Sequence, residues 1–118
     1  MAITGTHLLI YSPQAEECRR LLQEAFGFRS VDAGGGWLIF ALPPAEVGVH
    51  PAGEDGAPHH EMSLMCDDIR KTMAELEGKG VKFEGGVNEQ RWGITTMMVL
   101  PGEVRMMLYQ PRHPVAAS

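Results

Sequence analysis

The sequence lacks long hydrophobic runs, has few cysteines and aromatic residues, and carries no excess of basic charge. No apolar stretch approaches the roughly 20 residues that a membrane-spanning helix needs. The N-terminus also lacks the basic start and apolar core of a signal peptide. We therefore expect a soluble, cytoplasmic protein that does not bind membranes. Its 118 residues fit one ordinary domain.

Cysteine usage and net charge exclude two further classes of protein. Cys18 and Cys66 fall inside a predicted helix and a predicted strand, without neighbouring residues at ligand spacing, so we interpret them as reduced core residues. The formal net charge is −5, and Lys and Arg are scattered. Nucleic acid is excluded as a partner, because phosphate binding needs a basic stripe. The acidic balance suits a cationic small ligand, or it reflects solubility alone.

The first half of the chain contains one helix pattern among strand patterns. Ser12 is the predicted N-cap, Pro13 takes the first helical position, and Gly27 ends the helix. The apolar face of the helix recurs at helical spacing and consists of Cys18, Leu21, Leu22, Ala25 and Phe26. Strands bounded by glycine and proline turns are predicted at Thr4–Tyr11, Phe28–Val31, Trp37–Leu42 and Glu46–His50.

The second half repeats this order after a polar, turn-rich connector at residues 52–58. Asp67 is the predicted N-cap of a helix whose apolar stripe is Ile69, Met73 and Leu76. Strands are predicted at Glu61–Cys66, Val81–Phe83, Gly93–Leu100 and Val104–Tyr109, with Gly85-Gly86 opening a loop. Residues 112–118 look like a loose tail.

Both halves therefore read β-α-β-β-β, as modules at residues 4–51 and 59–111. Landmarks recur at a nearly constant offset: His7 corresponds to Glu61, Phe28 to Phe83, Trp37 to Trp92, and Pro51 to Pro111. Such a repeat indicates one supersecondary unit used twice. Because one curved sheet with a single helix cannot cover both of its faces, the copies should pack together and leave a concave surface.

Three sets of residues carry a likeness to a known family. The first is His7–Tyr11 before a helix that ends at Ala25–Phe28, and the second is Met65–Ile69 before a helix that ends at Gly78–Phe83. The third is Leu100–Gly102 followed by Leu108–Pro111. In these features the chain resembles the vicinal oxygen chelate superfamily, which groups glyoxalase I, extradiol dioxygenases, and fosfomycin- and bleomycin-resistance proteins. The resemblance implies an α+β fold of two tandem βαβββ modules forming an open eight-stranded cup. It also implies that a homodimer completes the cup.

The resemblance further implies one divalent metal ion in many members, for which we consider Fe, Mn, Ni or Zn. Family ligands come from the head of the first strand and from the fourth strand of each module. The first-strand positions fall on His7 and on Glu61, or on His60 if the register shifts by one. The fourth-strand position of the first module falls on Val47, and a slip of one residue brings Glu46 or His50 inward instead.

The fourth-strand position of the second module falls on Met107, where metal-binding members usually carry glutamate. A thioether suits an apolar pocket wall better than a hard metal ion. The candidate pocket residues are Trp37, Trp92, Met107 and Tyr109, although both tryptophans fit core packing equally well. Met97, Met98, Met106 and Met107 either line an adaptable cavity or pack beneath the helices.

Two functions follow from these residues. In the first, the cup binds a small organic molecule, and a metal held by His7, Glu61 and either Glu46 or His50 polarises adjacent substrate oxygens, as in a lyase or dioxygenase. In the second, the cup sequesters an antibiotic or metabolite without metal and without chemistry. No serine or cysteine has a base near it in the sequence, so covalent catalysis has no support.

Overall fold

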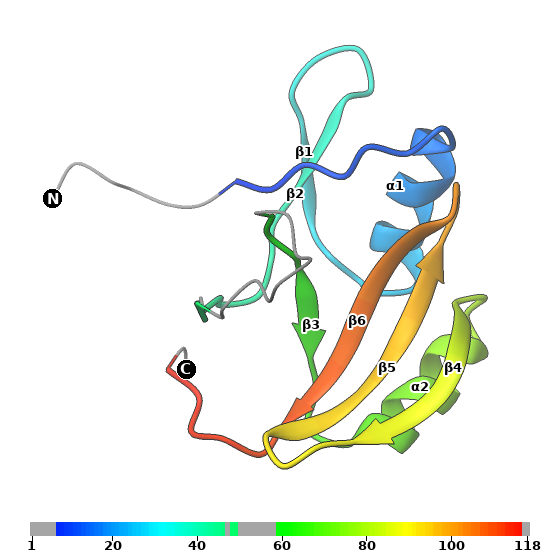
Figure 1. Cartoon of the computed structure of the whole chain (residues 1–118). Coiled ribbons are helices and arrows are strands. Elements are labelled where there is room, and N and C mark those ends of the chain that lie inside the picture. The colour runs from blue at the N-terminus through cyan, green and yellow to red at the C-terminus, as the bar shows by residue number, and fades with distance from the viewer. Residues whose placement is uncertain (1–6, 47, 50–58, 117–118) are drawn as a thin grey trace, which may run out of the picture.

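The protein is an α+β structure, as predicted. The computed structural model describes residues 7–46, 48–49 and 59–116. Its elements, shown in Figure 1, are α1 (Ala15–Glu24), β1 (Ser30–Asp32), β2 (Leu38–Phe40), β3 (Ser63–Met65), α2 (Ile69–Glu77), β4 (Lys82–Glu89), β5 (Gly93–Leu100) and β6 (Val104–Pro111). In these ranges no helix is long and apolar enough to cross a membrane.

The second module forms a curved four-stranded sheet in the order β3-β6-β5-β4 (Figure 1). β3 runs parallel to β6, and the other neighbours are antiparallel. The register places Met107 opposite Met97 on one side and opposite Ser63 on the other. Because side chains alternate along a strand, these three residues share one face, whereas Met98 and Met106 share the opposite face.

The core lies on the face that carries Met98, between the sheet and both helices. Its buried residues come from α1 and its C-cap, α2, β5, β6 and the residue before β4. They form one apolar cluster: Cys18, Ala25, Ile69, Leu76, Val81, Ile94, Met98, Leu100, Met106 and Leu108. The helical stripes predicted from the sequence supply its helix side. Cys18 and Cys66 are free thiols, in agreement with their interpretation as reduced residues.

The first module is attached to the second at the turn between β5 and β6. The Pro101 carbonyl oxygen accepts hydrogen bonds from Ser12 Oγ at 2.8 Å and from Cys18 Sγ at 3.3 Å. Gly102 makes this approach possible, because a Cβ atom there would overlap the Ser12 hydroxyl and lie 2.9 Å from Pro13 Cδ. The helix that the sequence assigns to the first module therefore packs on the sheet of the second.

Among the described residues, the first module contains two of its four predicted strands. β1 and β2 pair only with each other, with Val31 opposite Ile39. Residues 7–11 form no strand, because they pair with none of the described strands, and Tyr11 is 85% exposed. The predicted strand at 46–50 forms no strand at Glu46, Gly48 or Val49. Val47, His50 and the connector at 52–58 lie outside the described residues.

Three local predictions need correction. α1 begins at Ala15 with Gln14 as its N-cap, rather than with Ser12 as N-cap and Pro13 as the first helical residue. The Ser12 hydroxyl accepts the Gln14 backbone N–H at 3.0 Å and so lies one turn before the helix. The N-cap of α2 is Asp68 rather than Asp67, because Asp68 Oδ1 accepts the Lys71 backbone N–H at 3.2 Å. The predicted loop at Gly85-Gly86 lies inside β4. Both glycines have positive φ, 77° and 65°, and the pairing with β5 shifts register between Glu84 and Asn88. The strand thus continues through the two glycines, which form a bulge, instead of ending at Phe83.

Candidate ligand-binding face

One face of the four-stranded sheet is turned away from both helices. It carries the side chains that alternate with the core residues, namely Ser63 and Met65 of β3, Thr95 and Met97 of β5, and Met107 and Tyr109 of β6. A hollow of about 350 Å³ lies on this face, and its lining consists of Glu84, Gly85, Asn88, Thr95, Thr96, Met97 and Met107. The hollow combines an apolar floor of two methionines with a polar rim.

The rim of this hollow is formed by the bulge in β4. Thr96 Oγ1 donates a hydrogen bond to the Gly86 carbonyl at 2.8 Å, which holds the bulge against β5. The Arg105 guanidinium binds the Glu84 carboxylate with Nε 2.5 Å from Oε1 and Nη2 3.2 Å from Oε2. These bonds lower the pKa of Glu84 below its ordinary value. Glu84 is therefore a charged, oriented group at the edge of the hollow.

An aromatic cluster stands at the other end of the same face. The rings of Trp92 and Tyr109 pack edge to face with centroids 5.4 Å apart, and the His113 ring lies 5.7 Å from Tyr109. Tyr109 Oη donates to the Trp92 carbonyl at 3.2 Å. Burial, followed by the charge of Glu46, raises the pKa of Tyr109 above its ordinary value. The phenol therefore stays neutral and acts as a hydrogen-bond donor.

The four candidate pocket residues fall in different places. Met107 lines the hollow, and Trp92 and Tyr109 form the aromatic cluster. The guanidinium carbon of Arg19, on α1, lies 5.1 Å from the ring centroid of Trp37, whose side chain is 57% exposed. The sequence equivalence of Trp37 and Trp92 therefore does not place them in similar surroundings.

The candidate metal ligands do not gather into a site among the described residues. His7 is exposed, and the exposed Glu61 carboxylate lies 3.7 Å from His59 Nε2. Glu46 accepts the Ala116 backbone N–H at 2.8 Å and lies 4.0 Å from His113 Nε2. His50 falls outside the described ranges. Within those ranges no three His, Cys, Asp or Glu side chains are grouped so that they could hold a metal ion.

Several residues at these sites were not predicted from the sequence. His113 belongs to the segment expected to be a loose tail, yet its ring packs on Tyr109. Glu84 and Asn88 line the hollow because the bulge keeps them in β4. Only the glycine pair could have signalled this, since a glycine inside a strand pattern often marks a bulge.

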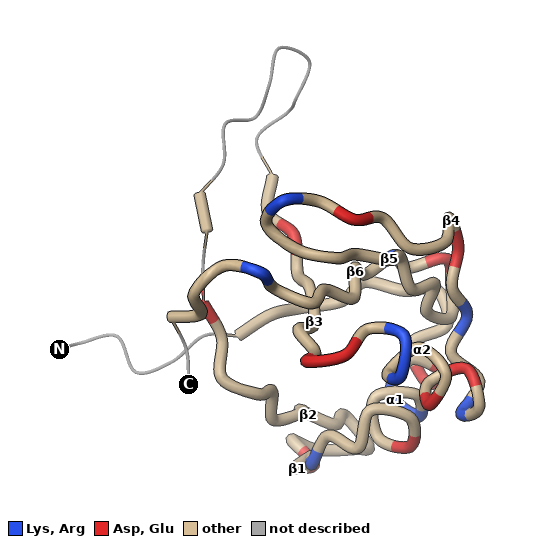
Figure 2. Tube along the Cα trace, turned by 90° about the horizontal axis from the view of Figure 1, so that it is seen from below, with Lys and Arg blue, Asp and Glu red and all other residues tan. Residues whose placement is uncertain are grey.

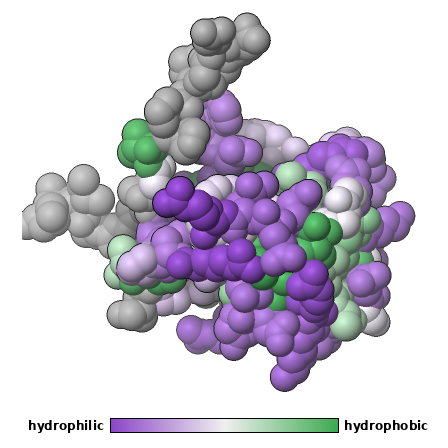
Figure 3. All heavy atoms as spheres, turned by 60° about the horizontal axis from the view of Figure 1, so that its bottom comes forward, coloured by the Kyte–Doolittle hydropathy of each residue, from purple (hydrophilic) through white to green (hydrophobic). Residues whose placement is uncertain are grey.

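Charged residues are spread along the chain (Figure 2), whereas hydrophobic residues gather in places on the surface (Figure 3). Figure 2 shows acidic and basic residues interspersed along the trace, without a basic stripe. Seen from the side drawn in Figure 3, the surface is mainly hydrophilic, with one hydrophobic area right of centre and smaller hydrophobic groups at the left.

The sheet order and the face left free by the helices define the fold as that of the glyoxalase/bleomycin-resistance/dioxygenase proteins. Solved structures of such proteins superpose on nearly the whole chain. TnmS3, an antibiotic-binding protein from Streptomyces sp. CB03234, is 24% identical, with 94% of this chain and 98% of that chain covered and a TM-score of 0.63. The likeness predicted from the sequence is therefore confirmed at the level of the fold.

Two further structures widen the comparison. A superfamily member from Sphaerobacter thermophilus DSM 20745 is 20% identical, with 93% and 99% of the two chains covered and a TM-score of 0.63. The fosfomycin-resistance protein FosX from Listeria monocytogenes is 10% identical, with 93% and 94% covered and a TM-score of 0.58. No protein-family model and no curated protein sequence matches this chain.

Proposed function

We propose that this protein binds a small organic molecule on the helix-free face of the four-stranded sheet and sequesters it without chemistry. The observation that carries the proposal is the hollow in which Met97 and Met107 form the floor and Glu84 and Asn88 form part of the rim. Its volume of about 350 Å³ lies in the range of small-molecule sites. Methionine side chains adapt to irregular ligand shapes.

The chemistry of the lining favours an apolar ligand with hydrogen-bond donors. The thioethers of Met97 and Met107 offer polarizable contact area to a ring system, while the Asn88 amide and the Glu84 carboxylate accept hydrogen bonds at the rim. The antibiotic-binding TnmS3 and the resistance protein FosX share this fold over most of their length. An antibiotic or a metabolite of similar chemistry is therefore our proposed class of ligand.

Metal-assisted chemistry is not part of the proposal, because the expected ligand position on the fourth strand of the second module carries a thioether instead of a carboxylate. Met107 stands where metal-binding members of the resembled family usually carry glutamate, and the residue paired with it on β3 is Ser63. Soft thioethers are poor ligands for metals that prefer oxygen. Glu46, the remaining carboxylate candidate of the first module, is already bonded to the Ala116 N–H.

We also propose a homodimer whose second copy completes the cup. The two-stranded sheet of β1 and β2 has no further strand beside it among the described residues, and a two-stranded hairpin alone is marginal in water. Val31 and Trp37 of this part are 69% and 57% exposed. Sedimentation equilibrium should report twice the monomer mass. A monomer at all concentrations up to 100-fold above the ligand-binding range would contradict it.

Binding is tested by screening antibiotics and aromatic metabolites for quenching of tryptophan fluorescence and for a rise in melting temperature. For any ligand found, Met107→Glu should weaken binding at least tenfold, because it places a carboxylate in the apolar floor. Met107→Leu is the matched control, since it nearly conserves volume and should change Kd less than threefold. If Met107→Glu leaves Kd unchanged, the ligand does not bind on this face.

A further inference from the structure

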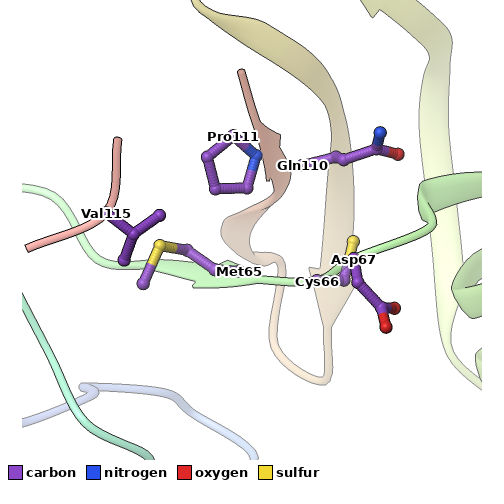
Figure 4. A pocket seen from close by; sticks show the side chains of 6 residues that line it. All are labelled: Met65, Cys66, Asp67, Gln110, Pro111 and Val115. Carbon is purple, nitrogen blue, oxygen red and sulfur yellow. The ribbon is translucent and has the colours of Figure 1, made fainter. Parts of the chain in front are cut away.

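A second and larger hollow lies beyond the ends of β3 and β6. Its volume is about 500 Å³, and its lining consists of Met65, Cys66, Asp67, Gln110, Pro111 and Val115. Figure 4 shows that Met65 and Val115 lie close to each other on one side, with Gln110, Cys66 and Asp67 toward the other. None of these residues lines the first hollow. The two hollows therefore have different lining residues.

Val115 is the part of residues 112–116 that lines this hollow, and we call this segment the strap. One end of the strap is held at the turn between β4 and β5. The Arg112 backbone N–H donates to the Trp92 carbonyl at 2.9 Å, Nη1 donates to the Gln90 carbonyl at 3.0 Å, and Nη2 lies 2.9 Å from Glu89 Oε1. A segment expected to be loose is thus fixed before it passes the hollow.

The other end of the strap is held by the first module. Glu46 Oε1 accepts the Ala116 backbone N–H at 2.8 Å, and Glu46 Oε2 lies 4.0 Å from His113 Nε2. Between these two ends, Val115 turns its side chain into the lining of the hollow. The side chain of Glu46 is only 21% exposed, so the contact is partly shielded from water.

We propose that this hollow is a binding site for an uncharged small organic molecule, and that the strap is its movable wall, kept in place by Glu46. Within residues 112–116, the hydrogen bond at the far end is the one from the Ala116 N–H to the Glu46 carboxylate, so the strap can open there while the bonds of Arg112 persist. Opening would move Val115 away from Met65 and admit a ligand. Glu46 is then a positioning residue of this site and not a metal ligand.

The lining determines the class of ligand. Met65, Pro111 and Val115 offer apolar contact area. Gln110 Oε1 accepts the Ile69 backbone N–H at 2.9 Å, and this bond does not use the two donors of the amide NH₂ group. The carboxylate of Asp67 disfavours anions at the same end. A neutral molecule with an apolar part and a carbonyl or ether oxygen matches this arrangement.

Ligand binding can be tested with Nile red, a neutral dye that carries a carbonyl group and whose emission shifts to the blue in apolar surroundings. We expect saturable binding to the wild type. Val115→Asp, which places a charge in the apolar wall, should weaken it at least tenfold, and Met107→Glu should not change it. Absence of saturable binding, or equal affinity of Val115→Asp and wild type, would overturn the proposal.

The same variants separate this site from the proposed function. Loss of Nile red binding in Met107→Glu but not in Val115→Asp would place the dye on the helix-free face, which overturns the site at the strap and supports the proposed function. The opposite result supports the site at the strap. In that case the proposed function is tested by the ligand screen described above.

Movement of the strap is tested by amide hydrogen exchange at Ala116, whose N–H is bonded to Glu46. We expect Glu46→Ala to accelerate this exchange at least tenfold and to weaken Nile red binding. Glu46→Gln retains an acceptor oxygen and should restore most of the protection. Glu17→Ala, on the exposed side of α1, is the control. Unchanged exchange at Ala116 in Glu46→Ala would show that Glu46 does not hold the strap.

Discussion

Gly93 lies directly beneath the aromatic ring of Tyr109, so closely that a Cβ atom at position 93 would overlap the ring edge at Cε1. The same Cβ would lie 2.8 Å from the Gln110 carbonyl oxygen. The absence of a side chain at the start of β5 therefore allows Tyr109 to lie across the sheet and reach both Trp92 and His113.

Gly93→Ala should displace the Tyr109 ring and destabilise the protein by about 1–3 kcal/mol, the usual cost of overpacking. Thermal and urea unfolding measure this change. Gly48→Ala is the matched control, because a Cβ there meets nothing within 4 Å, and its effect should stay within about 0.5 kcal/mol. Equal stability of the two variants would show that Tyr109 is not held over Gly93.

Asp68→Ala should lower the free energy of unfolding by about 1 kcal/mol, because Asp68 Oδ1 accepts the Lys71 N–H at the start of α2. Asp67→Ala should change it by less than about 0.5 kcal/mol, as is usual for an exposed residue. Chemical denaturation of both variants compares the two neighbours directly. A larger loss in the free energy of unfolding for Asp67→Ala would support Asp67 as the N-cap, as predicted from the sequence.

The stability contributed by Glu84 should depend on pH. The bonds from Arg105 lower its pKa in the folded state below the ordinary value of 4.5. A lowered pKa stabilises the folded protein above the unfolded-state pKa, and this contribution is lost as the pH falls through the folded-state pKa. The melting temperature of the wild type should therefore exceed that of Glu84→Gln near pH 7, and the difference should shrink below about pH 4.5.

Glu75→Gln, which removes an exposed carboxylate on α2, controls for the loss of one charge in this comparison. Differential scanning calorimetry from pH 7 to pH 3 gives both profiles. If the Glu84→Gln and wild-type profiles stay parallel over this range, the ion pair with Arg105 contributes nothing to stability.

Metal content should not depend on His7 or Glu61. Because neither belongs to a group of three potential ligands among the described residues, protein purified without chelator should hold the same amount of metal as His7→Ala and Glu61→Ala. Elemental analysis measures this content. Addition of Mn, Fe, Ni or Zn should shift the melting temperatures of all three proteins equally. A metal that is bound stoichiometrically by the wild type and is lost in His7→Ala would support the metal-dependent function.

The elements best predicted from the sequence are those whose apolar pattern is set by one buried face. α1, α2, β5 and β6 all show this, because their core residues recur at the period of a helix or a strand. Asp67 and Asp68 are equally good caps by residue type, and only the backbone geometry distinguishes them. Residues 7–11 carry strand-forming side chains, but a strand also needs a paired backbone, which sequence does not reveal.

The site was harder to predict, because its parts come together through long-range contacts. Met107 and Tyr109 alternate along β6 with buried residues, so their position on the helix-free face could be inferred. His113 could not, because a histidine between prolines and small residues looks like solvated chain. Its ring is placed by Tyr109 and by Glu46, which lies far from it in sequence.

The place of β6 in the sheet also constrains how the chain can fold. β6 follows every other strand in the sequence, yet it lies between β3 and β5. Until it has been synthesised, β3 has no strand to pair with, and Met106 and Leu108 are missing from the core. Pairing over such separations is slow compared with local contacts. We therefore expect the nascent chain to expose its apolar strands until residues 104–111 have left the ribosome.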